Sequence, residues 1–120
     1  MTSEVADQAA KWDDAFNKGD TASLGGFYAP EALVIPAGGA PVKGPEAIGK
    51  FFKDLQANGF SDHKIAVDNV IEKGDTLIAS GKWQLNGPGE NGATKQYGGN
   101  WVNVVKRNGS DFQILLHTWN

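Results

Sequence analysis

The C-terminal stretch QILLHTWN, residues 113–120, places a histidine and a tryptophan two positions apart in a strand-like sequence. Side chains at alternate positions of a strand share a face, so one face carries Gln113, Leu115, His117 and Trp119. An imidazole with its ordinary pKa of about 6.5 takes up and releases a proton near neutral pH. His117 is therefore the first candidate for acid or base chemistry.

Two tryptophans, Trp83 and Trp101, lie in the middle of the two strands predicted before the last one, and Tyr97 and Asn103 are in phase with Trp101. Any one of these aromatic residues could simply fill the core. Several indole and phenol groups in one small core, however, need polar partners or a ligand. The pattern therefore also indicates a pocket, in which Asn103 would orient His117 and hydrogen-bond a carbonyl ligand.

Asp13 and Asp14 form a short acidic run in the N-terminal helix that the sequence predicts. Such a run usually marks a solvated helix face. Asp13, however, directly follows Trp12, which faces the core. Asp13 is therefore a second candidate base, placed at the mouth of a cavity.

The second histidine, His63, follows Asp62 where the long strands begin. Together with His117 these residues would offer three metal ligands, but they lack His-x-x-x-His or any other ligand spacing. The sequence therefore predicts a solvated loop pair at His63 and Asp62, with no metal site and no cofactor.

Three helices are predicted in the first half of the chain. Residues 3–18 form an amphipathic helix, with apolar residues at helical spacing: Val5, Ala9, Trp12 and Phe16. Gly19 ends this helix, and Asp20 begins a second, short helix that carries Leu24, Phe27 and Tyr28 and ends at Pro30. Pro45 opens a third helix, which Gly59 ends, with an apolar stripe of Ile48, Phe51, Phe52 and Leu55.

Strands account for most of the remaining sequence. ALVIPAGGAPVKG, residues 32–44, is a strand that turns through glycines and prolines into a short returning strand. From residue 64 the apolar pattern has a period of two, and three turn signals divide it into four antiparallel strands: KGD near residue 74, NGPGENG at 86–92, and Asn108-Gly109. This order predicts a single α+β domain over residues 1–120, with the helices packed against one sheet.

Composition limits the classes of function. The chain has 120 residues with a net charge of −3, and its eleven lysines and arginines are scattered, so no nucleic-acid partner is expected. No apolar run is long enough to span a membrane. The acidic N-terminus lacks a basic segment and an apolar segment, so the expected location is the cytoplasm. The absence of cysteine excludes disulfides and thiolate chemistry.

The element order, together with FNKGD, FYAPEALVIP, VKGPEAIGKFF and ILLHTWN, resembles the SnoaL-like, ketosteroid-isomerase-like superfamily of cone folds, which also includes a nuclear transport factor. The resemblance covers nearly the whole chain. It implies a curved sheet, a cystatin-like α+β barrel, wrapped around a mostly apolar cavity, usually in a homodimer packed through the sheets. It does not imply one activity, because such folds host enzymes and catalytically silent domains.

The resemblance can be tested at single residues. Matching YAPEALVIPAGG to the steroid-isomerase pattern places Pro36 where that enzyme's base would lie, and matching FNKGD places Trp12 where its tyrosine donor would lie. Proline cannot accept a proton, and an indole is a far poorer acid than a phenol. Steroid isomerisation is therefore not predicted. In relatives, the position of His117 often projects into the cavity.

These observations predict a cone-shaped domain that binds a small, largely apolar, carbonyl-bearing or cyclic molecule. Acid/base conversion by an isomerase-, dehydratase- or hydrolase-like reaction would use His117 and Asp13. The expected ligand-binding residues are Trp12, Tyr28, Trp83, Tyr97, Trp101, Asn103 and Trp119. The alternative is a non-catalytic module for ligand binding or dimerisation, whose own aromatic residues fill the cavity.

Overall fold

The computed structural model describes residues 2–109 and 111–120, with the side chains of 4–20, 22–109 and 111–120. The helical elements are α1 (Thr2–Lys18), α2 (Thr21–Gly26), α3 (Pro45–Ala57) and the short 3-10 turn η1 (Glu90–Gly92). The strands are β1 (Tyr28–Ile35), β2 (Val42–Lys43), β3 (Ser61–Lys73), β4 (Thr76–Pro88), β5 (Thr94–Asn108) and β6 (Asp111–Trp119). The predicted α+β class and the order of its elements are confirmed.

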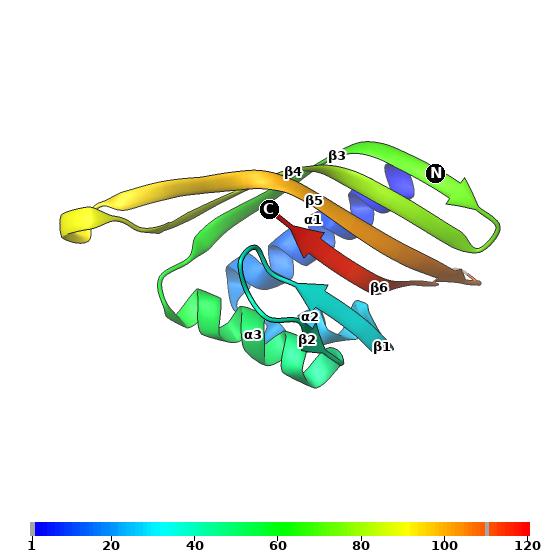
Figure 1. Cartoon of the computed structure of the whole chain (residues 1–120), viewed down its shortest axis with the longest axis horizontal. Coiled ribbons are helices and arrows are strands. Elements are labelled where there is room, and N and C mark those ends of the chain that lie inside the picture. The colour runs from blue at the N-terminus through cyan, green and yellow to red at the C-terminus, as the bar shows by residue number, and fades with distance from the viewer. Residues whose placement is uncertain (1, 110) are drawn as a thin grey trace.

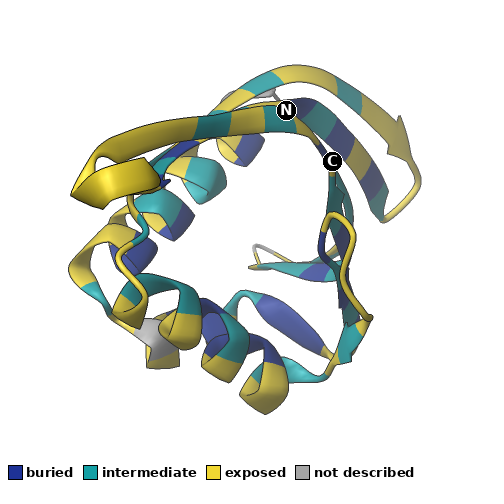
Figure 2. Cartoon of the chain, turned by 60° about the vertical axis from the view of Figure 1, so that its left-hand side comes forward, coloured by how far each residue is buried: buried dark blue, intermediate teal, exposed yellow. Residues whose placement is uncertain are grey.

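The strands form one mixed, curved and unclosed sheet in the order β2-β1-β6-β5-β4-β3. Neighbouring strands are antiparallel except β1 and β6, which run parallel. The sheet bends around the helices, and the β4–β5 hairpin extends beyond them (Figure 1). Helices and sheet surround a common interior (Figure 2). None of the helices in the described residues is long and apolar enough to cross a membrane.

Local chemistry explains where the helices begin and end. Asp20 caps α2, because its carboxylate accepts hydrogen bonds from the backbone N–H and the hydroxyl of Ser23 at 3.3 and 2.7 Å. Gly44 precedes α3 with a φ of 88°, which favours glycine, and Pro45 occupies the first turn, where its missing N–H costs nothing. The inner faces of α1 and α3 bury Phe16 and Ile48 almost completely.

Phe27 and Tyr28 were predicted in the second helix, and that prediction is wrong. Helix α2 ends at Gly26, and Tyr28 is the first residue of β1. The carbonyl of Phe27 accepts a hydrogen bond from the Ile114 N–H at 2.8 Å, and Tyr28 pairs with Ile114 in parallel. Pro30 does not end a helix but lies where this pairing is interrupted, so its missing N–H breaks no ladder. The long-range pairing with β6 overrides the local helical pattern and puts the Tyr28 side chain on the sheet.

Candidate functional site

A cavity of about 240 Å³ lies between the helices and the inner face of the sheet. Its wall is mostly aromatic and aliphatic, and the titratable side chains in it are His63, Tyr97 and His117. The other lining residues are Trp12, Phe16, Pro36, Ala37, Phe51, Phe52, Leu55, Phe60, Ile65, Trp83, Leu85, Trp101 and Trp119. In such a wall, the few polar groups decide what chemistry is available.

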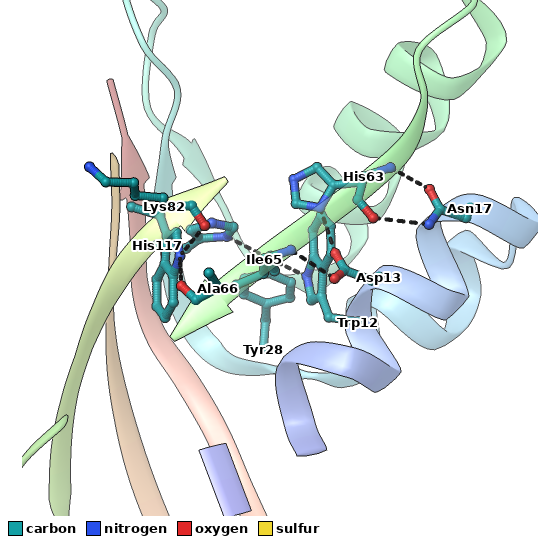
Figure 3. A network of polar contacts seen from close by, with 10 residues as sticks. Trp12, Asp13, Asn17, Tyr28, His63, Ile65, Ala66, Lys82 and His117 are labelled. Atoms are coloured by element: carbon teal, nitrogen blue, oxygen red, sulfur yellow. Dashed lines mark hydrogen bonds and ion pairs between the residues drawn. The ribbon is translucent and has the colours of Figure 1, made fainter. Parts of the chain in front are cut away.

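His63 is paired with Asp13, which lies on α1. The Nδ1 atom of His63 is 2.6 Å from Asp13 Oδ1, and the backbone N–H of Ile65 donates to Asp13 Oδ2 at 2.9 Å (Figure 3). The side chains of His63 and Asp13 are only 12% and 16% exposed. Because the carboxylate accepts a hydrogen bond from Nδ1–H, a neutral His63 carries its lone pair on Nε2.

Helix α1 also holds the backbone of His63. Asn17 lies one helical turn after Asp13, and its side-chain oxygen accepts from the His63 N–H at 2.8 Å. The amide group of Asn17 donates to the His63 carbonyl at 3.1 Å. Both the imidazole and the peptide of His63 are therefore fixed by one face of α1, as Figure 3 shows. This gives the ring a defined orientation at the cavity wall.

The prediction of a solvated His63–Asp62 pair is wrong. Asp62 has a φ of 55°, and the pairing of β3 with β4 shifts register between Ser61 and Lys64. This local irregularity turns Asp62 outward, where its carboxylate accepts from the Asn86 amide at 3.2 Å, while His63 faces the cavity. Sequence reasoning missed His63 because a strand irregularity changes which face a residue occupies. The sequence signal that could have found it is Asp13 and Asn17 at helical spacing.

A second polar chain runs from Trp12 through Tyr28 to His117. The indole N–H of Trp12 donates to the Tyr28 hydroxyl oxygen at 3.0 Å, and that oxygen is 2.9 Å from His117 Nδ1 (Figure 3). All three side chains are buried. A buried polar group without a partner costs about 1–3 kcal/mol, so this chain stabilises an otherwise apolar interior.

Burial changes the acid–base properties of this chain. Burial, with a smaller contribution from nearby His63, lowers the pKa of His117 from 6.5 to about 3. Burial also raises the pKa of Tyr28 above its ordinary value, against the lowering effect of the Trp12 hydrogen bond. The ordinary pKa of about 6.5, from which the sequence names His117 as a candidate acid or base, therefore does not apply to the buried side chain. At neutral pH His117 is uncharged and Tyr28 keeps its proton.

Most of the predicted ligand-binding residues line the cavity. Those in its wall are Trp12, Trp83, Tyr97, Trp101 and Trp119. Tyr28 is not in the wall but hydrogen-bonds His117. Asn103 lies opposite His117 in the β5–β6 ladder and lines a separate cavity of about 30 Å³. The predicted orientation of His117 by Asn103 is not observed, because Nδ1 contacts Tyr28.

Three buried polar groups in the strands differ in their partners. The Trp101 indole donates to the carbonyls of Ala66 and Lys82, both at 3.1 Å. Within residues 2–109 and 111–120, the side-chain oxygen of Asn103 and the indole N–H of Trp83 are buried without a protein partner. Of these three groups, only the Trp101 N–H has hydrogen-bond partners among the described residues, and its role is therefore structural.

Acidic and imidazole groups do not gather into a metal site in the described part of the chain. No three His, Asp or Glu residues there lie close enough to hold an ion. His63 uses its Nδ1 atom for Asp13, and His117 uses its Nδ1 atom for Tyr28. Each imidazole therefore has Nε2 left for a contact with a ligand.

The model of the SnoaL-like domain matches residues 9–111. The chain belongs to the SnoaL-like domain family. No protein of curated function matches it significantly. The resemblance inferred from the sequence is thus confirmed for this SnoaL-like domain.

Solved structures agree with the family and show its fold. An NTF2-like protein with a cystatin-like fold from Novosphingobium aromaticivorans is 18% identical, with a TM-score of 0.82 over 98% of this chain and 79% of its own. The protein Aln2 from a Streptomyces species is 18% identical, with a TM-score of 0.83 over 98% and 88%. An NTF2-like superfamily protein from Salmonella enterica is 19% identical, with a TM-score of 0.80 over 99% and 89%. At these identities the likeness establishes the fold alone.

This SnoaL-like domain carries Trp12 and Pro36 at the two positions that the sequence comparison matched to steroid-isomerase machinery. Both residues line the cavity. Pro36 offers no proton acceptor, and the Trp12 N–H is directed to Tyr28. The imidazole of His63 is therefore the best-oriented proton acceptor in the cavity wall.

Proposed function

We propose that this SnoaL-like domain binds a small, largely apolar, carbonyl-bearing ring compound and converts it by proton transfer, with His63 as the base. The observation that carries the proposal is the Asp13–His63 pair, oriented at the wall of an apolar cavity. The sequence predicts Asp13 itself as a candidate base. Because both of its oxygens accept hydrogen bonds, Asp13 acts as a positioning residue for His63.

The size and composition of the cavity support this class of ligand. A cavity of about 240 Å³ is smaller than the roughly 300–1,000 Å³ pockets that hold drug-sized ligands. One or two fused rings fit that volume. The wall of Trp12, Phe52, Trp83 and Trp119 offers flat apolar contacts, and none of the described lining residues is a lysine, arginine or carboxylate that could balance a ligand charge. A neutral planar molecule is therefore the best match.

The proposed reaction begins with the carbon–hydrogen bond next to a carbonyl. His63 Nε2 takes the proton, and the bonding electron pair forms a carbon–carbon double bond while the carbonyl electrons move to oxygen as an enolate. The Asp13 carboxylate stabilises the imidazolium that results. Return of the proton from His63 to a conjugated carbon gives isomerisation. Exchange results when the protonated His63 first swaps this proton for a deuteron from the solvent and delivers the deuteron to the original carbon. Both routes regenerate the base.

Proton exchange on a simple ketone tests this proposal directly. Purified protein and indanone, a planar bicyclic ketone, are incubated in deuterium oxide, and NMR follows loss of the hydrogens next to the carbonyl. The wild type should accelerate exchange over buffer, and His63→Gln should lose at least about a hundredfold of that acceleration. Lys64→Gln, at an exposed neighbouring position, is the matched control and should retain it. Equal exchange by wild type and His63→Gln would rule out His63 as the base.

A second candidate role is self-association, which the outer face of the sheet favours. One row across the four long strands carries Ile71, Ile78, Val104 and Leu116, paired in register. Ile71 and Ile78 are 52% and 36% exposed, which is unusual for large aliphatic side chains on a sheet. We propose that this row packs against the same row of a second copy. Such a homodimer is compatible with either a catalytic or a purely ligand-binding cavity.

A further inference from the structure

The two hydrogen bonds that link Trp12, Tyr28 and His117 allow only one assignment of donors and acceptors. An indole nitrogen only donates, so the Tyr28 oxygen must accept from Trp12 at 3.0 Å. The Tyr28 hydroxyl hydrogen then has His117 Nδ1, 2.9 Å away, as its acceptor. The reverse arrangement, with Nδ1–H donating to Tyr28, would leave a buried hydroxyl hydrogen without an acceptor in the described part of the chain. A neutral His117 therefore carries its single proton on Nε2.

The Nε2–H group of His117 has no hydrogen-bond partner in the described part of the chain. The ring hydrogen bond of His117 uses Nδ1, and none among the described residues reaches Nε2. The fully buried side-chain atoms that lack a partner are Trp83 Nε1 and Asn103 Oδ1, and His117 Nε2 is not among them. The His117 ring lines the cavity, surrounded by the rings of Trp12, Phe52 and Trp119 at centroid distances of 5.9, 6.2 and 4.9 Å. A donor in this position is available to a ligand.

The two histidines thus have opposite proton arrangements. His63 donates its Nδ1–H to Asp13 and keeps a lone pair on Nε2, whereas His117 accepts the Tyr28 hydroxyl hydrogen at Nδ1 and keeps its proton on Nε2. The indole of Trp12 contacts both rings, with centroid distances of 4.8 Å to His63 and 5.9 Å to His117. One cavity therefore offers one acceptor and one neutral donor.

We propose that His117 is the neutral hydrogen-bond donor that binds the oxygen of the ligand, and that the ligand is an uncharged ring ketone or enone with its acidic carbon–hydrogen bond toward His63. The choice of an acidic carbon–hydrogen bond rests on the proposed function, while recognition of the oxygen by His117 does not. Burial, which lowers the pKa of His117, keeps it uncharged at neutral pH. Its N–H therefore binds a carbonyl oxygen and, after proton loss, the enolate oxygen that develops there.

Comparison of a ketone with its hydrocarbon measures the oxygen contact alone. Indanone and indane have nearly the same shape, and their dissociation constants are obtained from quenching of tryptophan fluorescence. The wild type should bind indanone about tenfold more tightly than indane, because indane leaves the His117 N–H unpaired. His117→Phe should abolish this preference, and His117→Gln, which restores a side-chain donor, should recover part of it. A preference that persists in His117→Phe, or is absent from the wild type, overturns the proposal.

NMR of the unmodified protein tests the proton arrangement without any mutation. In protein labelled with nitrogen-15 histidine, His117 should show a protonated Nε2 and an unprotonated Nδ1 from about pH 5 to pH 8. Tyr28→Phe removes the donor to Nδ1, so part of the His117 population should then carry its proton on Nδ1 and none on Nε2. The preference for the ketone should fall in proportion. A wild-type His117 protonated on Nδ1 would overturn the proposal.

The two proposals fail separately. Loss of proton exchange in His63→Gln together with an intact ketone preference supports both. If the wild type shows the ketone preference but no exchange, the proton-transfer function fails and oxygen recognition by His117 stands. If exchange depends on His63 but the ketone preference survives in His117→Phe, the proton-transfer function stands and oxygen recognition by His117 fails.

Discussion

The Nδ1 atom of His63 on β3 lies 2.6 Å from a carboxylate oxygen of Asp13 on α1, although the two residues are 50 positions apart in the sequence. The second Asp13 oxygen accepts from the Ile65 N–H, so the carboxylate connects the helix both to the strand backbone and to the imidazole. This contact joins the architecture to the proposed chemistry, because it fixes which nitrogen of His63 is a base.

Asp13→Asn should lower the rate of indanone proton exchange by at least about tenfold, because an amide cannot stabilise the imidazolium that forms on His63. Asp14→Asn is the matched control, since the Asp14 carboxylate is 64% exposed and pairs with Lys18 at 2.9 Å. NMR in deuterium oxide measures both variants. Equal losses in the two would mean that general helix charge, and not the His63 contact, matters.

Stability should fall as the pH is lowered from about 6.5 to about 3. The pKa of His117 is lowered from 6.5 to about 3 in the folded protein, so the unfolded chain binds this proton first. The contribution of the buried, neutral His117 to the free energy of unfolding is fully present above pH 6.5. Between pH 6.5 and about 3 it decreases by up to about 1.4 kcal/mol per pH unit. Because other side chains contribute to the pH profile of both proteins, the measured quantity is the difference between the free energies of urea unfolding of wild type and His117→Gln at each pH. Parallel pH profiles for the two proteins would contradict the assignment to His117.

Asn103→Leu should leave the free energy of unfolding unchanged or raise it by up to about 1 kcal/mol, because the buried Asn103 oxygen has no partner in the described residues. Leucine has a similar shape and fills the same space, whereas Asn103→Ala would add a cavity and is the destabilised comparison. Urea unfolding measures all three proteins. A tenfold loss of indanone affinity in Asn103→Leu would instead support the carbonyl contact predicted from the sequence.

Gly87→Ala should weaken ligand binding by displacing Phe60, which lines the cavity. A methyl group on Gly87 would lie 2.5 Å from Phe60 Cε1, so the ring must shift, at a cost of about 1–3 kcal/mol. Gly26→Ala is the control, because a methyl group there meets nothing within 4 Å. Indanone titrations of both variants measure the effect. Unchanged affinity in Gly87→Ala would show that Phe60 does not shape the binding space.

Ile78→Lys should convert the proposed homodimer to a monomer, because two charged side chains would be buried at the centre of the outer-face row. Light scattering coupled to size-exclusion chromatography measures the mass of wild type and variant. Ile71→Lys, at the edge of the same row, should weaken association less. A monomeric wild type would contradict the dimer.

The sequence alone determined much of the architecture. The apolar spacing of Val5, Trp12 and Phe16 predicted α1, and the turn signals KGD, NGPGENG and Asn108-Gly109 predicted the divisions between the long strands. These signals are local, since each depends on residues within one helix turn or one hairpin. The SnoaL-like family also followed from motif order, and the family match supports it.

Only the tertiary structure decided the polar relationships of the site. Tyr28 became a strand residue, within reach of His117, through parallel pairing with Ile114. His63 turned inward through a register shift at the start of β3, and so came within reach of Asp13. These contacts join distant segments, and a shift of one residue reverses the face that a side chain occupies. The residue types were visible in the sequence, but burial and hydrogen-bond partners decided which histidine carries a lone pair toward the cavity and which carries a proton.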